Sequence, residues 1–389
     1  MQPVAADDAV RFLTGAVVNS YGQDGALSSL FVRGGESTYN KVIVDGVYVS
    51  EPGLTFDFGT LPLGQADRLE FLRGAQSTLY GSDAMTSVVQ VWTRTGSTPT
   101  PELRFGADGG NFSTANGCAS LSGARGRYDY NFFGDQFNTN GSGVNNAYSD
   151  SLSGANVGAA LNAKTSLRVR VRHSNSHTGL PGAWDFNGTE LIPPLAVGNA
   201  QTNTLLGSTE LTIAEPSGWQ HRFTASDYVY RYFDNSPDGN TYNFASVYNY
   251  DINHVAGEYQ GDYSERSWAH STFGYRIENE SAFFGYPAFP PPTHGQRLNQ
   301  DAYLQQQLTL GRLSVVTGGR FVHSSEFGNI GVPRVALTLL ARHGSEILSQ
   351  TRLRFSYATA YMDPDFTETF AGLPYYVSHP GLLPERTRA

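Results

Sequence analysis

The sequence predicts a mainly β protein, and both its composition and its alternating segments point to this class. Charged residues make up 16% and aromatic residues 13% of the 389 residues, and glycine occurs 43 times. A long helical bundle or coiled coil would carry more charge and less glycine, whereas aromatic side chains favour strands and membrane interfaces. The composition therefore excludes the long helical classes.

The first part of the chain contains a predicted hairpin. Segments 41–44 and 47–49 are rich in valine and flank Asp45 and Gly46. A two-residue Asp-Gly connection supplies the positive φ that a tight hairpin requires.

A run of small residues and prolines at 96–101 then marks a boundary. Such runs are typical of linkers. We expect a first domain over residues 1–96, a linker over 97–101 and a second domain over 102–389.

Period-2 alternation predicts many strands in the second domain. In residues 167–172, Arg168, Arg170 and Arg172 alternate with apolar residues, so the three guanidinium groups share one face. The same alternation occurs in four further segments, which are 128–132, 273–278, 335–339 and 353–357.

The predicted connections are of two kinds, short turns such as 317–319 and long stretches such as 176–202 and 283–297. This combination is typical of outer-membrane barrels. Alternation alone is equally compatible with a soluble β-sandwich or propeller.

Charge and motifs exclude several function classes. The net charge is −9, the basic residues are scattered, and Lys41 and Lys164 are the only lysines, so the footprint of a nucleic-acid binder is missing. The chain has no phosphate-binding loop, no zinc-protease motif and no nucleophile elbow. We therefore predict that the protein is not an enzyme and holds no cofactor or metal.

Two histidines and one cysteine are weak candidates for chemistry. His173 and His177 lie four residues apart and could share a strand face, but a position at an exposed loop edge explains them better than metal binding. Cys118 has no histidine close by in the sequence, so we expect a small buried residue instead of a nucleophile.

An acidic cluster is a third weak candidate. Asp363, Asp365 and Glu368 could serve as paired carboxylates of a glycoside hydrolase. Because Pro364 separates the two aspartates, a capped turn is the better interpretation.

Three segments of the first domain, 31–35, 42–49 and 68–84, resemble in order and spacing the plug domain of TonB-dependent outer-membrane receptors, closest to the cobalamin-receptor-like branch. Segments 356–370 and 379–386 are similar to barrel segments of that family. The motif residues that carry the plug resemblance are Arg33, Gly34, Asp45, Gly46, Glu70, Arg73, Gly74, Tyr80 and Gly81. The chain departs from the family where it has Ala75-Gln76 in place of Gly-Pro, and Thr86-Ser87 in place of Gly-Gly.

The resemblance implies a small α+β plug inside a transmembrane antiparallel β-barrel of the 22-stranded type. At about 20 residues per strand, residues 102–389 supply roughly 14 strands. We therefore expect a chain that is incomplete at both ends, with an unclosed barrel. Two unpaired strand edges would prevent it from inserting and transporting by itself.

The function that the resemblance implies is TonB-dependent uptake of a scarce chelate, such as a ferric siderophore or cobalamin, across the outer membrane of a Gram-negative bacterium. The expected partners are TonB with its inner-membrane complex, the chelate and outer-membrane lipid, and the expected state is a monomer. The alternative from another class is a secreted or surface β-protein acting as an adhesin or a carbohydrate-binding module.

The resemblance also assigns roles to individual residues. Arg33 and Arg73 are expected to form ion pairs between plug and barrel. Arg168, Arg170 and Arg172 are expected to face the lumen, with Leu167, Val169 and Val171 facing lipid. The expected ligand contacts are aromatic residues of long loops, namely Trp184, Phe186, Phe283, Phe284, Tyr286 and Phe289.

Overall fold

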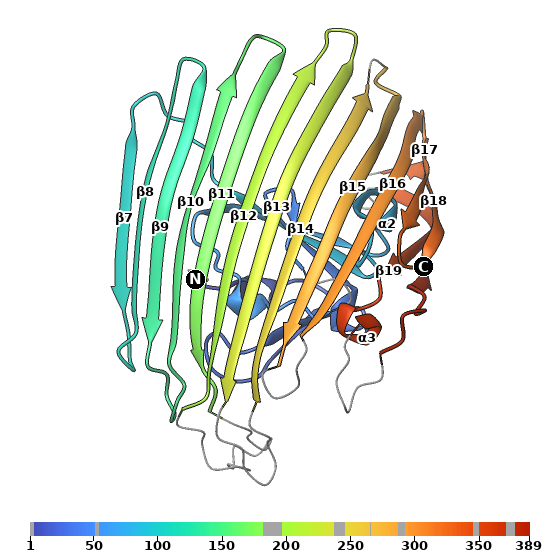
Figure 1. Cartoon of the computed structure of the whole chain (residues 1–389). Coiled ribbons are helices and arrows are strands. Elements are labelled where there is room, and N and C mark those ends of the chain that lie inside the picture. Colours follow the sequence, from blue (N-terminus) through green and yellow to red (C-terminus); the bar gives the residue numbers. More distant parts are fainter. Residues whose placement is uncertain are drawn as a thin grey trace.

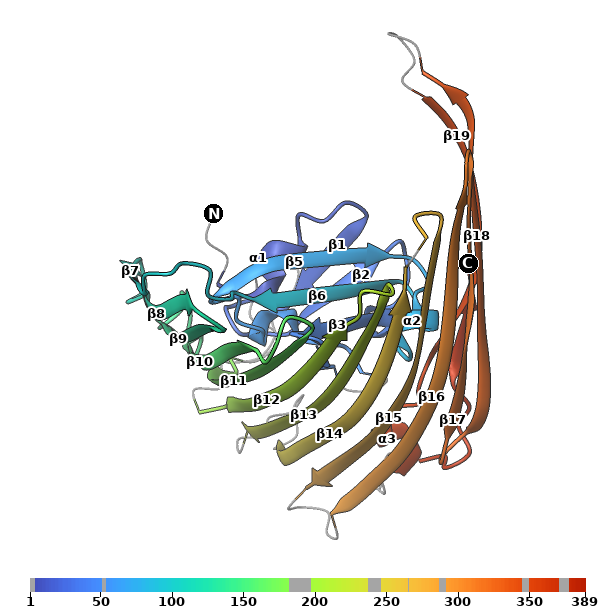
Figure 2. The same ribbon diagram turned by 90° about the horizontal axis from the view of Figure 1, so that it is seen from above.

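The computed structural model describes residues 4–50, 54–181, 197–236, 246–264, 266–286, 292–344, 350–370 and 378–389. It consists of one large curved sheet and a smaller unit, residues 4–96, which we call the inner unit (Figure 1). Seen from above, the sheet curves around the inner unit, which lies on its concave side (Figure 2).

The large sheet has 14 strands, and each is hydrogen-bonded to its neighbours in chain order. This confirms the expected antiparallel architecture and the expected strand number. Within the described residues, β7 and β20 form the two ends of an open sheet. The strands are β7 (Glu102–Gly109), β8 (Ala115–Arg125), β9 (Tyr128–Thr139), β10 (Tyr148–Ala160), β11 (Thr165–Gly179), β12 (Asn199–Ala214), β13 (Trp219–Ser236), β14 (Ser246–Tyr263), β15 (Ala269–Gly285), β16 (Thr293–Leu310), β17 (Leu313–Ser324), β18 (Gly328–His343), β19 (Gln350–Met362) and β20 (Glu385–Arg388).

The predicted connections need three corrections. Residues 317–319 lie inside β17, with Gly318 paired to Arg334, so the expected turn is wrong. A side chain on Gly318 would come within 2.6 Å of the Leu304 carbonyl oxygen, so this glycine permits close packing between strands. The two long connections are also shorter than expected, because strand pairing continues to Gly179 and Gly285.

The inner unit combines two small sheets with short helices. Its four-stranded sheet has the order β4-β3-β6-β5, and only β3 and β6 are parallel. Asp45 and Gly46 have φ values of 52° and 84°, which confirms the predicted hairpin between β3 and β4. The elements are α1 (Ala6–Val10), β1 (Ala16–Ser20), β2 (Ser28–Val32), η1 (Ser37–Tyr39), β3 (Asn40–Val44), β4 (Val47–Tyr48), η2 (Phe58–Thr60), β5 (Ala66–Arg73), α2 (Ser77–Tyr80) and β6 (Ser87–Thr93).

The hydrophobic core of the inner unit is continuous with the wall of the large sheet. Val42 and Val89, from adjacent parallel strands, are fully buried, and they share one cluster with Leu206 of β12 and Tyr228 of β13. Burial of such side chains contributes about 1.5–3 kcal/mol each. The two units are therefore packed as one body.

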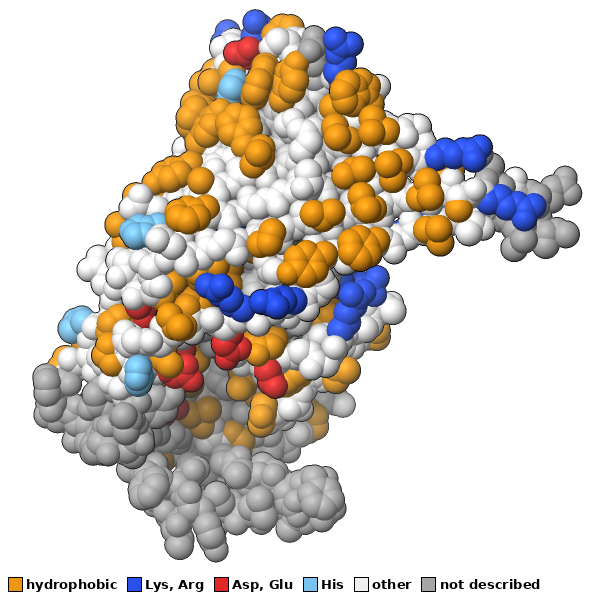
Figure 3. Space-filling view, turned by 90° about the vertical axis from the view of Figure 1, so that its right-hand side faces the viewer, with side chains coloured by type: hydrophobic (Ala, Val, Ile, Leu, Met, Phe, Trp, Pro, Cys, Tyr) orange, Lys and Arg blue, Asp and Glu red, His pale blue; other side chains and the backbone are white. Residues whose placement is uncertain are grey.

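The outer face of the sheet is apolar. Val169 and Val171 of β11 are exposed, whereas Arg170 and Arg172 between and beside them are buried. Figure 3 shows hydrophobic side chains spread over one side of the molecule. The exposed hydrophobic residues of the sheet include Phe321 of β17 and Phe355 of β19. No helix in the described part of the chain is long and apolar enough to span a bilayer.

Candidate functional site

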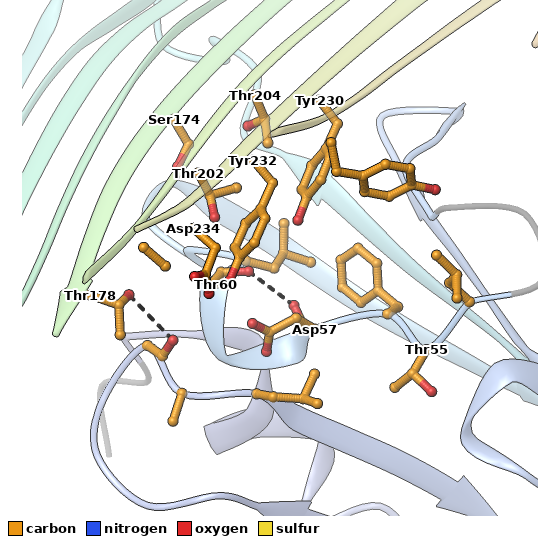
Figure 4. A pocket seen from close by; sticks show the side chains of 18 of the residues that line it. Thr55, Asp57, Thr60, Ser174, Thr178, Thr202, Thr204, Tyr230, Tyr232 and Asp234 are labelled. Carbon is orange, nitrogen blue, oxygen red and sulfur yellow. Dashed lines mark hydrogen bonds between the residues drawn. The ribbon is translucent and has the colours of Figure 1, made fainter. Parts of the chain in front are cut away.

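A cavity of about 800 Å³ lies between part of the inner unit and β11–β15. It lies at the end of the sheet where the long connections join the strands, and Leu180 and Tyr286 are among its lining residues. Figure 4 shows Thr202, Thr204, Tyr230 and Tyr232 pointing from the sheet toward an inner-unit segment that carries Asp57. A concave site of this size fits a small-molecule ligand.

Tyrosine rings form much of the sheet side of the cavity. Alternate residues of a strand share one face, so Tyr230 and Tyr232 of β13 both face inward, with ring centroids 6.5 Å apart. Tyr232 contacts Tyr248 of β14 at 5.7 Å, and Tyr250 stacks on Phe284 of β15 at 4.6 Å. These spacings are typical of favourable aromatic pairs, so the wall presents broad ring surface together with hydroxyl groups.

The inner-unit side of the cavity is a hydrogen-bonded loop that carries Asp57. The backbone N–H groups of Ser28 and Gly59 each donate to Asp57 Oδ1 at 2.9 Å. Burial nevertheless raises the pKa of Asp57 to about 7, because removing a carboxylate from water opposes its ionisation. The loop thus places a carboxyl group that can be neutral or charged near neutral pH at the cavity wall.

The charges around the cavity are acidic. The described lining residues include two acidic residues, Asp57 and Asp234, and one basic residue, Arg172. The Arg172 guanidinium donates a hydrogen bond to the Pro62 carbonyl oxygen. The connections at this end, 110–114, 140–147, 180–198, 237–245, 286–292 and 363–384, contain no Lys or Arg. Basic residues instead occur in turns at the opposite end, at Arg127, Lys164, Arg266 and Arg312.

Arginines of the large sheet hold the inner unit in place. Arg320 of β17 donates to the Leu79 carbonyl oxygen at 3.1 Å and to Asp301 Oδ2 at 2.7 Å. Arg334 of β18 donates to Gln76 Oε1 at 2.6 Å. These contacts fix the α2 segment against β16–β18.

The inner unit also buries a charged side chain, Lys41 of β3. Lys41 Nζ lies 3.8 Å from the centre of the Tyr48 ring and donates to the Ser82 carbonyl oxygen at 3.2 Å. The Tyr48 hydroxyl group donates a short hydrogen bond to Asp83. Burial lowers the pKa of Lys41 and raises that of Asp83 to about 6.

The two plug arginines that the sequence singles out are not buried. Arg33 is exposed with a φ of 52°, and exposed Arg73 donates to the Thr14 carbonyl oxygen at 3.0 Å. Neither forms an ion pair within the described part of the chain. Their role in ion pairing stays a prediction.

The remaining plug-motif residues occupy structural positions. Asp45 accepts hydrogen bonds from the N–H and hydroxyl groups of Thr93, Glu70 accepts one from Trp92 at 3.3 Å, and the Tyr80 hydroxyl group accepts one from Gln90. Gly34, Gly46, Gly74 and Gly81 all have positive φ.

The three β11 arginines lie on the side that faces the inner unit. Arg168 binds Asp129 at 2.9 Å, Arg170 binds Glu210 at 3.4 Å, and Arg172 reaches the Pro62 carbonyl oxygen. Of the three, Arg172 alone lines the cavity.

The predicted ligand contacts are only partly within the described residues. Trp184, Phe186 and Phe289 lie outside them. Phe283 and Phe284 belong to strand β15, which corrects the expectation of loop tips, and Phe284 lines the cavity beside Tyr286.

The two candidate histidines both lie in β11, near its end. His173 contacts the Asn203 side chain at 3.1 Å, and His177 is exposed. Asp365 Oδ1 accepts the Thr367 N–H at 2.9 Å at the start of α3 (Phe366–Phe370), which confirms the capped turn.

Two further candidates from the sequence are Cys118 and Glu368. Cys118 is only partly buried, because it lies on β8 near the open edge of the sheet. Glu368, the third member of the acidic cluster, lies in α3.

Most of the cavity wall was not predicted from the sequence. Tyr228, Tyr230 and Tyr232 recur at every second position, which was a usable signal for one inward aromatic face. Asp57 and Arg320 carried no comparable local signal, because their environments come from segments distant in sequence.

Comparison with known families agrees with this architecture. A model described as TonB-dependent Receptor Plug Domain matches residues 1–88, and one described as TonB dependent receptor-like, beta-barrel matches residues 53–389. Vitamin B12 transporter BtuB from Vibrio cholerae is 41% identical over 86 residues, which are 22% of this chain and 14% of that protein.

Solved structures with the same fold include siderophore receptor PirA from Acinetobacter baumannii, with TM-score 0.75, 14% identity, 99% of this chain and 65% of that one. For the ferric enterobactin receptor PfeA from Pseudomonas aeruginosa, the TM-score is 0.74 and the sequence identity 13%, and the match covers 94% of this chain and 61% of that one. For the ferric yersiniabactin uptake receptor FyuA from Yersinia pestis, the TM-score is 0.72 and the sequence identity 16%, and the match covers 92% of this chain and 62% of that one. This chain thus spans less than two thirds of each of these proteins. With a barrel-family match that covers most of its residues, the chain belongs to the TonB-dependent receptor family.

Proposed function

We propose that this protein captures a small chelate at the outer membrane and passes it inward in a step driven by TonB. The observation that carries the proposal is the cavity, which is built jointly by plug loops and barrel strands at the long-connection end. A ligand bound there would contact both units at once, so binding could alter how the plug is held. We assign the plug to residues 1–96, the linker to 97–101 and the barrel wall to 102–389.

We further propose that the ligand is a neutral or cationic chelate. A ferric triscatecholate is anionic, because its catecholate oxygens outnumber the charge of the iron, and it would meet Asp234 and the partly ionised Asp57, with Arg172 as the one basic residue among the described lining residues. Cobalamin and neutral ferric chelates avoid this repulsion and offer flat or bulky surface to the tyrosines. Charge complementarity contributes mainly to specificity and to association rate.

The experiment is ligand binding by the full-length protein in detergent. Cyanocobalamin and ferric enterobactin are titrated in parallel, and quenching of the intrinsic aromatic fluorescence is followed. We expect saturable binding of cyanocobalamin and binding of the anionic chelate that is at least tenfold weaker. Tighter binding of ferric enterobactin would refute the charge argument, and binding of neither would leave the chelate proposal without support.

A matched pair of variants locates the site. Tyr250→Ala removes a ring from the cavity wall, whereas Tyr357→Ala removes an exposed ring of β19. Truncating a stacked aromatic contact should weaken binding by roughly 1–3 kcal/mol in the first variant only. Equal affinity in both variants would place the ligand elsewhere.

A further inference from the structure

One buried histidine on the barrel wall has no hydrogen-bond partner among the described residues. His254 of β14 is only 2% exposed, and neither Nδ1 nor Nε2 forms a hydrogen bond within the described part of the chain. The plug residue Tyr48 covers the imidazole, with ring centroids 5.4 Å apart and an angle of 22° between the planes. Two unsatisfied ring nitrogens in a buried position are costly unless something binds them.

Two carboxylates face this imidazole from the next strand. His254 is paired with Glu280 of β15 in the strand register, and Glu278 lies two residues along on the same face. One imidazole nitrogen and one oxygen from each carboxylate lie within 4.8 Å of one another. All three side chains are buried.

The charges around these residues leave an acidic excess. The interacting basic groups are Lys41, Arg276, Arg297 and Arg320, and the interacting acidic groups are Asp83, Glu258, Glu278, Glu280, Asp301, Glu326 and Asp363. Within the described residues, this ion-pair network thus contains four cations and seven carboxylates. A buried cluster of this kind requires a further positive charge, either a proton or a metal ion.

We propose that His254, Glu278 and Glu280 bind one divalent transition-metal cation of the Zn²⁺ type on the inner wall of the barrel. A neutral imidazole nitrogen with two carboxylate oxygens is a ligand set that such ions accept, with water in the remaining position. The site lies at the plug–barrel interface, separate from the ligand cavity, and does not depend on which chelate is taken up.

The neighbouring arginines suit this assignment. Arg276 Nη2 binds Glu278 at 2.7 Å and Arg297 Nε binds Glu280 at 2.7 Å. Each carboxylate oxygen has more than one lone pair, so an oxygen that accepts from an arginine can also bind a metal. The arginines would orient the two carboxylates as outer-shell partners commonly do.

The test is metal binding by the full-length protein in detergent after treatment with a chelator. We expect calorimetric titration with Zn²⁺ to show one saturable site that weakens at least tenfold in His254→Gln. The matched control is His270→Gln, which removes an exposed histidine 3.7 Å from Asp262 and should leave the affinity unchanged. Equal loss in the two variants, or no zinc site in the unaltered protein, would overturn the proposal.

A second measurement needs no variant and guards against misfolding. Co²⁺ bound through nitrogen and oxygen at low coordination number gives visible absorption bands, and one equivalent of Zn²⁺ should abolish them. If the buried charge is balanced by a proton alone, no such bands appear, and the metal assignment is wrong.

Discussion

Arg320 of the barrel donates from Nη1 to the carbonyl oxygen of Leu79 in the plug, 3.1 Å away. The guanidinium thus satisfies a carbonyl group at the end of the short helix α2, while its other nitrogen binds buried Asp301. One side chain therefore completes both a helix end and an ion pair. This contact is the clearest link between plug and barrel in the described residues.

Replacing Arg320 should loosen the plug. Arg320→Ala leaves Asp301 buried without its partner, and breaking a buried pair in this way costs about 3–5 kcal/mol. We expect urea to release or unfold the plug at lower concentration, measured by limited proteolysis of residues 4–96. Arg354→Ala, which removes an exposed arginine of β19, serves as the control and should behave like the unaltered protein. Identical proteolysis of the two variants would contradict this role.

Gly81 should not tolerate a side chain. Its φ is 77°, and an added Cβ would lie 3.4 Å from Arg320 Nη2. Gly81→Ala should therefore destabilise the plug by about 1–3 kcal/mol, measured by denaturant unfolding. Gly117→Ala is the matched control, because Gly117 has no positive φ and open space around it. A loss of the same size in both variants would mean that backbone strain at Gly81 is not the cause.

Asp57 should make the stability of the protein depend on pH. Its pKa is raised to about 7 in the folded protein, against an ordinary value of 3.8, so the folded state binds more protons between these pH values. The free energy of unfolding should fall as pH rises from about 4 to about 7, by up to roughly 4 kcal/mol for this group.

Asp57→Asn keeps an oxygen that can accept from Ser28 and Gly59 but cannot ionise. We expect this variant to lose that part of the pH dependence, and to be more stable than the unaltered protein above pH 7. The exposed Asp67→Asn change should leave the dependence intact. Parallel pH profiles for all three proteins would show that Asp57 titrates normally.

The outer face of the sheet should behave as a lipid contact. Val171 of β11 is 43% exposed, and Val171→Arg places a charge in the proposed membrane region. Such a substitution costs about 2–4 kcal/mol near the bilayer midplane. Val144→Arg, at an exposed position in the connection between β9 and β10, should cost far less. Folding into lipid vesicles, measured by gel mobility, compares the two, and equal efficiency would favour a soluble sheet.

Local chemistry explains which parts of the fold could be predicted from sequence. The Asp45-Gly46 hairpin follows from two residues that accept positive φ, and the barrel strands follow from alternation between an apolar and a polar face. Gly318 was misinterpreted as a turn, because glycine serves equally in turns and where strands pack closely. The sequence alone does not separate these uses.

The candidate site was less accessible because it is assembled from distant segments. Asp57 and Tyr250 line the same cavity only because the plug lies inside the curved sheet. His254 and Glu280 become neighbours through the register of β14 and β15, which no local pattern specifies. Conversely, Arg33 and Arg73 were chosen from a resemblance, and both residues are exposed in the structure.

The shared core of plug and wall has a mechanical consequence. Removing the plug as a rigid body would expose Val42 and Leu206 to water in a single step, at a cost proportional to the apolar area uncovered. In the described part of the chain, strand β1 pairs only with β2, and its Ala16 and Val18 pack against this core. A force applied at the N-terminal end would act first on α1, whose Ala6 and Val10 are fully buried in the same cluster, so the shared core would be disturbed from that end before β1 separated from β2.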